Sequence, residues 1–234
     1  MADSGQSTAI LRLTVGTLSI AHPLTVPNAA VPATEVVPAL QGLVNAVVAA
    51  AETGQAISCR KGCGACCRQL VPLSRTEGER LLALIEGMPA ERRAVIEERF
   101  AKAAAKIEQA GLATPSRKSD RDLSVAYFAL RIPCPFLEEE SCSIHPDRPL
   151  VCREYLVTSP AELCRGAAQE GVTPVAVPKF SLSARGLQEE RDGWFPLAML
   201  MRWSKTRPKG GVRRTGPEWV QRFLKNVGSA GGSR

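Results

Sequence analysis

Eight cysteines dominate the chemistry that this chain of 234 residues can perform. Four of them fall within one nine-residue segment, and the other four follow singly between residues 134 and 164. Thiolates at such density bind zinc or iron–sulfur clusters, or they pair as disulfides. All eight are therefore candidate metal ligands: Cys59, Cys63, Cys66, Cys67, Cys134, Cys142, Cys152 and Cys164.

The compartment decides between metal and disulfides. The N-terminal residues carry no basic stretch of the kind that begins a signal peptide, and the apolar run 43–51 is too short to span a bilayer. We therefore expect a soluble cytoplasmic protein with no membrane partner, in which thiols stay reduced. The adjacent Cys66 and Cys67 are also poorly placed to bridge each other, so metal binding is favoured.

Apolar periodicity predicts the elements that must position these cysteines. The fold class expected is mostly α with an irregular Cys-rich metal-binding centre and a small extended or β N-terminal element. Ser74 and Glu77 form a capping-box pattern ahead of an apolar stripe. The helices are expected near 38–51, 76–88, 89–110, 119–131 and 217–227, after a strand within 8–20 and a proline-marked linker.

This pattern divides the chain into three segments. Residues 1–56 hold the N-terminal strand, linker and helix, 57–166 form the cysteine-cluster domain, and 167–234 form an extended segment followed by a basic helix and tail. The net charge of +7 resides in the last segment, because residues 197–234 contain nine basic residues and one acidic residue. That basic tail interleaves Trp203, Trp219 and Phe223 with its charges, but it contains no recognisable nucleic-acid-binding motif, so nucleic acid is not the expected partner.

Several short motifs occur in a defined order around the cysteines. These are Cys59-x3-Cys63-x2-Cys66-Cys67, Cys134-Pro-Phe-Leu, Cys142-x-Ile and Arg148-Pro-x-x-Cys152-Arg, followed by Cys164. Over roughly residues 57–166 the chain resembles the CxxCxxCC, or YkgJ-type, cysteine-cluster family of zinc- or iron-chelating domains, and a related cluster occurs in flagellin lysine methylases. The resemblance implies metal binding. One departure is His145, at a position where the family often has tyrosine.

The spacing favours an iron–sulfur cluster, with 4Fe-4S preferred, over zinc. Small zinc modules usually pair two Cys-x2–4-Cys knuckles, and the four later cysteines are too widely spaced to supply the second one. Iron–sulfur clusters tolerate irregular spacing. The Cys59-x3-Cys63-x2-Cys66 spacing also occurs in radical SAM enzymes, but the chain lacks the repeated strand–helix pattern of a large barrel.

Three functions remain open on the sequence. The first is binding of an iron–sulfur cluster or zinc. This function is compatible with a protein partner, which the sequence does not identify. The second is a protein-modifying, flagellin-methylase-like enzyme that uses the cluster, although nothing outside 57–166 visibly supplies a SAM pocket. The third is a zinc-stabilised interaction module with a basic tail.

The surroundings of the cysteines supply further expectations. Arg68, Arg148 and Arg153 flank cysteines, and cations there would lower thiol pKa values. His145 is either a ligand or a packed imidazole. We also expect at least two of the later cysteines to converge on the first cluster, because short helical connections return the chain toward its start.

Overall fold

The computed structural model of the chain describes residues 5–16, 18–113, 120–166, 170–187 and 193–229. Within these residues the structure is mostly helical, with small antiparallel strand pairs, which confirms the expected fold class. None of the helices in the described ranges has both the length and the apolar character needed to cross a bilayer. The helices are α1 (Val37–Glu52), α2 (Arg75–Glu86), α3 (Ala90–Gln109), α4 (Asp120–Ala129), α5 (Leu150–Glu154), α6 (Phe180–Arg185), α7 (Leu200–Thr206) and α8 (Gly216–Ser229).

The strands form two-stranded pairs of very different length. The long hairpin pairs β1 with β2 from Gln6↔Pro27 to Val15↔Leu18, so part of the expected proline-marked linker is in fact strand. The other pairs are two residues long, and two of them join segments far apart in the sequence. The strands are β1 (Gln6–Val15), β2 (Leu18–Pro27), β3 (Val31–Pro32) with β8 (Arg213–Arg214), β4 (Pro72–Leu73) with β7 (Phe195–Pro196), and β5 (Leu137–Glu138) with β6 (Ser141–Cys142).

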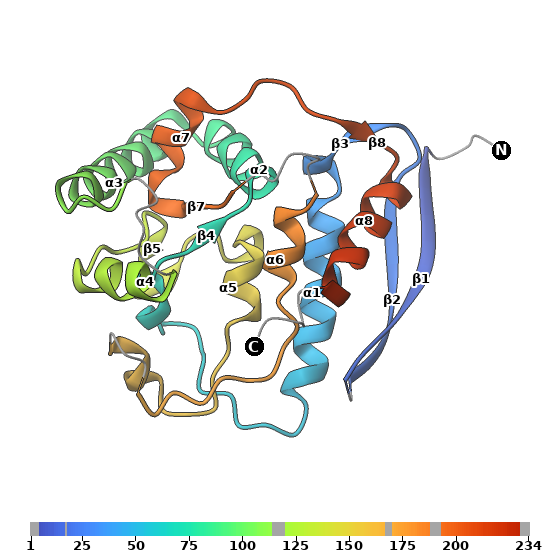
Figure 1. Ribbon diagram of the computed structural model, residues 1–234, viewed down its shortest axis with the longest axis horizontal. Coiled ribbons are helices and arrows are strands. Elements are labelled where there is room, and N and C mark those ends of the chain that lie inside the picture. Colours follow the sequence, from blue (N-terminus) through green and yellow to red (C-terminus); the bar gives the residue numbers. More distant parts are fainter. Residues whose placement is uncertain (1–4, 17, 114–119, 167–169, 188–192, 230–234) are drawn as a thin grey trace.

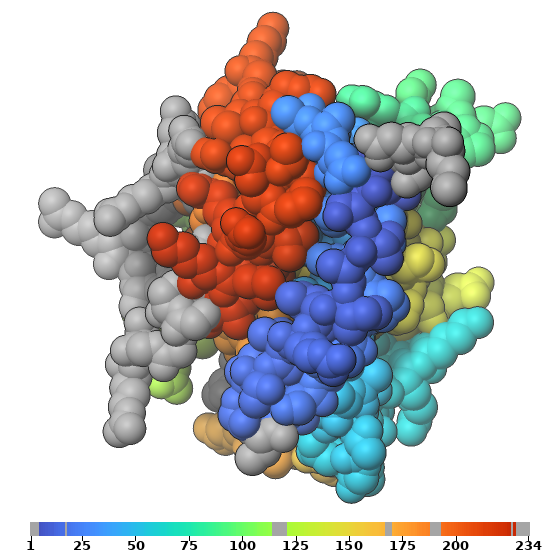
Figure 2. All heavy atoms as spheres, turned by 90° about the vertical axis from the view of Figure 1, so that its right-hand side faces the viewer, coloured from blue at the N-terminus to red at the C-terminus, as the bar shows by residue number. Residues whose placement is uncertain are grey.

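One half of the molecule is built on α1. The β1–β2 hairpin lies along one edge beside α1 and α8 (Figure 1), and Figure 2 shows the hairpin and α8 side by side on that face. Trp219 of α8 is fully buried and donates its indole N–H to the carbonyl of Val31 at 2.9 Å. Phe223 stacks on Phe180 of α6 with ring centroids 5.9 Å apart. This core draws side chains from all three predicted segments, and the division into domains stays a prediction.

The other half is built on α2 and α3. The predicted capping box is confirmed, because Ser74 accepts from the backbone N–H of Glu77 while the Glu77 carboxylate accepts from the backbone of Ser74. The apolar face of α3 includes Phe100, whose ring meets Phe136 edge-on at 5.4 Å. Phe136 directly precedes β5, so this packing fixes the segment that carries Cys134 and Cys142.

Candidate metal centre

The first four cysteines lie in a loop that ends in a short 3-10 helix. The loop follows α1, turns at Gly62, whose φ is +86°, and enters η2 (Ala65–Arg68). Backbone hydrogen bonds Cys63 N–H to Arg60 carbonyl (3.0 Å) and Cys67 N–H to Gly64 carbonyl (3.1 Å) tighten the turn. Glycine at 62 permits the left-handed backbone without a Cβ clash. The result is a compact bend on which all four thiols are half-buried.

The β5–β6 hairpin docks on this bend. Its two turn residues, Glu139 and Glu140, both adopt left-handed backbone, with φ of +46° and +56°. Ser141 accepts a hydrogen bond from the N–H of Gly62 at 3.1 Å. The Glu140 carboxylate pairs with Arg68 at 2.5 Å, and Arg68 also donates to the carbonyl of Gly64. These contacts seat the turn of the hairpin against the first cysteine segment.

The later cysteines arrive beside the first four from separate elements. The backbone N–H of Cys134 donates to the carbonyl of Cys67 at 2.7 Å. Cys142 ends β6, Cys152 lies in α5, and Cys164 is buried in η4 (Ala161–Arg165), which packs on η2. The backbone therefore brings the later cysteines close to the first four, as the sequence led us to expect. All eight cysteines are free thiols.

The helix that carries Cys152 is held by a buried carboxylate from another helix. Glu77, 4% exposed, accepts the backbone N–H of Leu150 at 2.8 Å, at the first turn of α5. Glu154 then accepts the backbone N–H and the hydroxyl of Ser181 at the start of α6. Glu77 thus caps both α2 and α5, and Glu154 joins α5 to α6. These bonds hold the helix that carries Cys152 in place.

The thiols raise one another's pKa values, and Cys66 is common to most of these effects. Its own pKa is raised first by donating a hydrogen bond to the Cys67 thiol and then by burial. Burial raises the pKa of Cys134 to about 12, with contributions from Cys142 and Cys66. Burial likewise raises the pKa of Cys142 and of Cys152, and the charge of Cys66 adds to both.

A second group of thiols lies on the other side of Cys66. Burial raises the pKa of Cys59 and of Cys164, and in each case Cys66 and Cys63 add to the effect. Cys59, Cys63 and Cys164 pack in one apolar cluster with Ala65, whereas Cys134 and Cys142 pack against another. Both the packing and the electrostatic effects therefore divide the thiols into two groups, and Cys66 interacts with both groups.

Arg148 opposes this accumulation of negative charge at several thiols, and Arg153 adds to the effect at Cys142. The guanidinium of Arg148 lowers the pKa values of thiols in both groups, namely Cys59, Cys66, Cys142 and Cys152. Arg153 has a second role. It is 3% exposed and donates to the carbonyls of Arg148 and Pro146 and to the Asn45 side chain. Burial lowers the pKa of Arg153 to about 10, and its contacts show that it braces irregular backbone.

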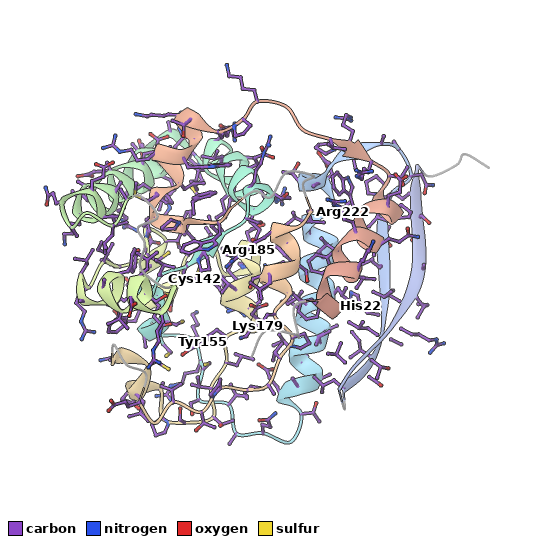
Figure 3. The ribbon with its side chains drawn as sticks, viewed as in Figure 1. His22, Cys142, Tyr155, Lys179, Arg185 and Arg222 are labelled. Atoms are coloured by element: carbon purple, nitrogen blue, oxygen red, sulfur yellow. The ribbon has the colours of Figure 1, made fainter. Side chains whose placement is uncertain are left out.

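Two side chains near the thiols belong to the same environment. His145 contacts a guanidinium nitrogen of Arg148 through Nε2 at 2.6 Å, and burial lowers its pKa together with the charges of Arg148 and Arg153. The sequence did not single out Tyr155, whose hydroxyl lies beside Cys164 and whose pKa is raised by burial. Figure 3 shows Cys142 and Tyr155 in the half of the molecule away from His22 and Arg222. His22 packs over Gly42 of α1 instead.

The donor chemistry fits a thiophilic metal. Thiols whose pKa values are raised by burial and by each other lose their protons readily only when a cation takes the protons' place. Within the described ranges, no three Cys, His, Asp or Glu side chains already surround a common point in the arrangement of a metal site. The assignment of the eight cysteines as ligands thus stays a prediction.

Comparison with known proteins gives a family for the cysteine segment. Residues 58–171 match the family model CxxCxxCC, described as a "putative zinc- or iron-chelating domain". The match covers 114 of the 234 residues and contains all eight cysteines, which confirms the resemblance of this segment to the CxxCxxCC family that the motifs indicated. No curated protein and no solved structure matches the chain.

Proposed function

We propose that the clustered cysteines bind metal as two thiolate sites, with iron–sulfur clusters of the 4Fe-4S type favoured over zinc. The observation that carries this proposal is the division of the thiols into two groups at Cys66. One group is Cys59, Cys63 and Cys164, and the other is Cys134, Cys142 and Cys152. The adjacent Cys66 and Cys67 would each complete one group, giving four thiolates per site.

The surroundings of the thiols support a charged, redox-capable group over a single structural zinc. The thiols come from a loop, a strand and two kinds of helix, and such irregular origins suit clusters better than paired knuckles. Arg148 faces both groups and would offset the negative charge of thiolate-ligated centres. When bound with four thiolate ligands, an iron–sulfur cluster would supply one-electron transfer. A reducing compartment such as the cytoplasm would keep the thiols available.

Metal analysis of anaerobically purified protein tests this proposal. We expect brown protein whose charge-transfer absorption is bleached by dithionite, with metal at two sites per chain. Cys164→Ser and Cys152→Ser should each lose about half of the metal, because each removes a ligand of one group only. Ser143→Ala is the matched control, since it removes a hydroxyl next to Cys142 that donates to the Phe136 carbonyl, but no thiol.

Three outcomes separate the alternatives. Colourless protein with stoichiometric zinc after iron-replete expression would establish a zinc domain instead. Complete loss of metal in either serine variant, with the fold retained by circular dichroism, would indicate a single shared centre. Folded wild-type protein that holds no metal under these conditions would refute the proposed function.

A further inference from the structure

A cleft opens beside the cysteine segment, on the side of the docked hairpin. Its volume is about 410 Å³, within the range of roughly 300–1,000 Å³ of small-molecule sites. It adjoins the cysteines because Ala65 directly precedes Cys66 and because Arg68 follows Cys67. The residues that line it are Ala65, Arg68, Phe128, Arg131, Glu140 and Arg165.

The lining carries an excess of positive charge. Three arginines face one carboxylate, that of Glu140. This carboxylate is already engaged by Arg68, with two contacts at 2.5 and 3.0 Å. Arg165 also faces Glu140, as its charge lowers the pKa of that carboxyl after the larger effect of Arg68. One acid therefore cannot neutralise the three cations, and the cleft offers guanidinium charge to an incoming ligand.

Arg131 is an exposed residue whose guanidinium is oriented by two contacts. It follows the end of α4 in left-handed backbone, with φ of +51°. Its guanidinium lies 4.5 Å above the ring of Phe128 and donates to the carbonyl of Arg165 at 2.8 Å. A non-glycine residue in this region is strained, and such strain gathers at ligand sites. The contacts orient the planar guanidinium, which loses less conformational freedom on binding as a result.

We propose that this cleft binds a small, multiply charged oxyanion, a molecule that bears phosphate or carboxylate groups, next to the cysteine segment. Guanidinium groups match the geometry of both oxyanions through paired N–H donors. Arg131 and Arg165 make the principal contacts, because Arg68 is engaged by Glu140. Phe128 and Ala65 are the apolar residues of the lining. This site goes beyond metal binding and does not depend on it.

Calorimetric titration of the purified full chain tests the proposal, with inorganic phosphate and citrate as separate probes and glycerol as an uncharged control. We expect binding of at least one of the two anions, weakened by added sodium chloride. Phosphate alone would indicate a phosphate-bearing ligand, and citrate alone a polycarboxylate. Both results support an oxyanion site.

The variants are chosen to remove charge without disturbing the fold. Arg131→Asn keeps a residue that tolerates left-handed backbone, and Arg165→Gln changes a side chain whose backbone carbonyl still receives Arg131. Each should weaken anion binding by about tenfold or more, the effect of losing one charge-assisted hydrogen bond. Arg12→Gln, in an exposed position on β1, removes the same charge outside the cleft and should leave binding unchanged.

Metal content, measured on the same preparations, separates this proposal from the metal function. Both cleft variants should keep the wild-type metal content, whether that content is high or nil. Wild-type protein that binds neither anion at millimolar concentration would overturn the proposal. It would also be overturned if Arg165→Gln bound anions as tightly as the wild type, and this second variant keeps the test valid even if Arg131→Asn fails to fold.

Discussion

The carboxylate of Glu77 accepts the backbone N–H of Leu150 at 2.8 Å, across 73 residues of sequence. Through its other oxygen it also accepts the backbone N–H and the hydroxyl of Ser74. One buried side chain therefore satisfies helix N-terminal groups of both α2 and α5, and it couples the helical half of the molecule to the helix that carries Cys152.

Glu77→Ala should destabilise the protein by about 3 kcal/mol, because it removes the cap of two helices and leaves the N–H of Leu150 buried without an acceptor. Ser74→Ala provides the comparison. It removes the side-chain cap of α2 and one donor to the Glu77 carboxylate but keeps the bond to Leu150, and it should cost about 1 kcal/mol. Urea denaturation measures both free energies of unfolding. Equal losses would show that the bond to α5 adds nothing.

Glu77 should also give the protein a defined pH dependence. Burial raises the pKa of Glu77 above its ordinary value of 4.5, against the opposing effects of its hydrogen bonds to Leu150 and Ser74. The folded chain then keeps this proton to a higher pH than the unfolded chain does. Its contribution to stability is therefore full below 4.5 and is lost as the pH rises through the folded pKa.

Glu77→Gln tests that dependence, since glutamine does not titrate and keeps an oxygen for Leu150. The free energy of unfolding of the wild type, measured relative to the variant, should fall as the pH is raised from 4.5. Urea titrations at successive pH values give this difference. A difference that increased with pH would mean that the carboxylate is net stabilised by its donors.

Gly64 should be required for the docking of the hairpin. A Cβ at this position would lie 2.7 Å from Oε2 and 3.2 Å from Cα of Glu140, and 2.8 Å from Cδ1 of Leu137. Because one of these contacts is to backbone, Gly64→Ala should push the hairpin away and cost about 1–3 kcal/mol. We expect metal content to fall with it.

Gly42→Ala is the matched control for this substitution. Its added Cβ would meet only His22 at 3.6 Å, and it lies within α1, where alanine is favoured by up to about 1 kcal/mol over glycine. Thermal unfolding and metal analysis compare the two variants. The melting temperature and the metal content should fall in Gly64→Ala, whereas in Gly42→Ala they should rise or stay unchanged. If Gly64→Ala kept both stability and metal, the hairpin would not need this close approach.

Arg148→Gln should raise the pH at which the protein releases its metal. Arg148 lowers the pKa values of Cys59, Cys66, Cys142 and Cys152, so its loss makes those thiols harder to deprotonate. Metal competes with protons for thiolates, and release then begins at a higher pH. Arg80→Gln is the control, because Arg80 pairs with Asp147. An unchanged release curve would show that the charge of Arg148 does not control deprotonation of the thiols.

Local sequence was sufficient to predict the longer helices, but it did not predict the short helices α5, α6 and α7 or the places where the helices meet. The capping box at Ser74 and Glu77 and the apolar stripe of α3 depend on residues three or four positions apart, so they are visible in the sequence. The bond from Leu150 to Glu77 depends on tertiary packing, and no local pattern near Leu150 indicates it.

The candidate site shows the same distinction. The eight cysteines and their family were recognisable from the motifs, because ligand type and spacing are local properties. Their division into two groups at Cys66 was not, since it depends on which loops pack together. The arginine cleft was missed as well. Its lining comes from four separate segments, and Arg131 is an unusual residue for left-handed backbone.

The turn of the β5–β6 hairpin is another feature that the local sequence does not indicate. Two-residue hairpin turns with both residues in left-handed backbone favour Asn and Gly, yet this turn has Glu139 and Glu140. Glu139→Asn should therefore stabilise the protein by about 1 kcal/mol, because asparagine tolerates this conformation better. Glu140→Asn relieves the same strain but loses the ion pair to Arg68, which is worth up to about 1 kcal/mol when part-exposed, so its net gain should be smaller. Urea denaturation of the two variants measures the difference. Equal gains would mean that the Arg68–Glu140 pair contributes nothing to stability, and a loss at position 139 would mean that Glu139 makes a contribution that outweighs its backbone strain.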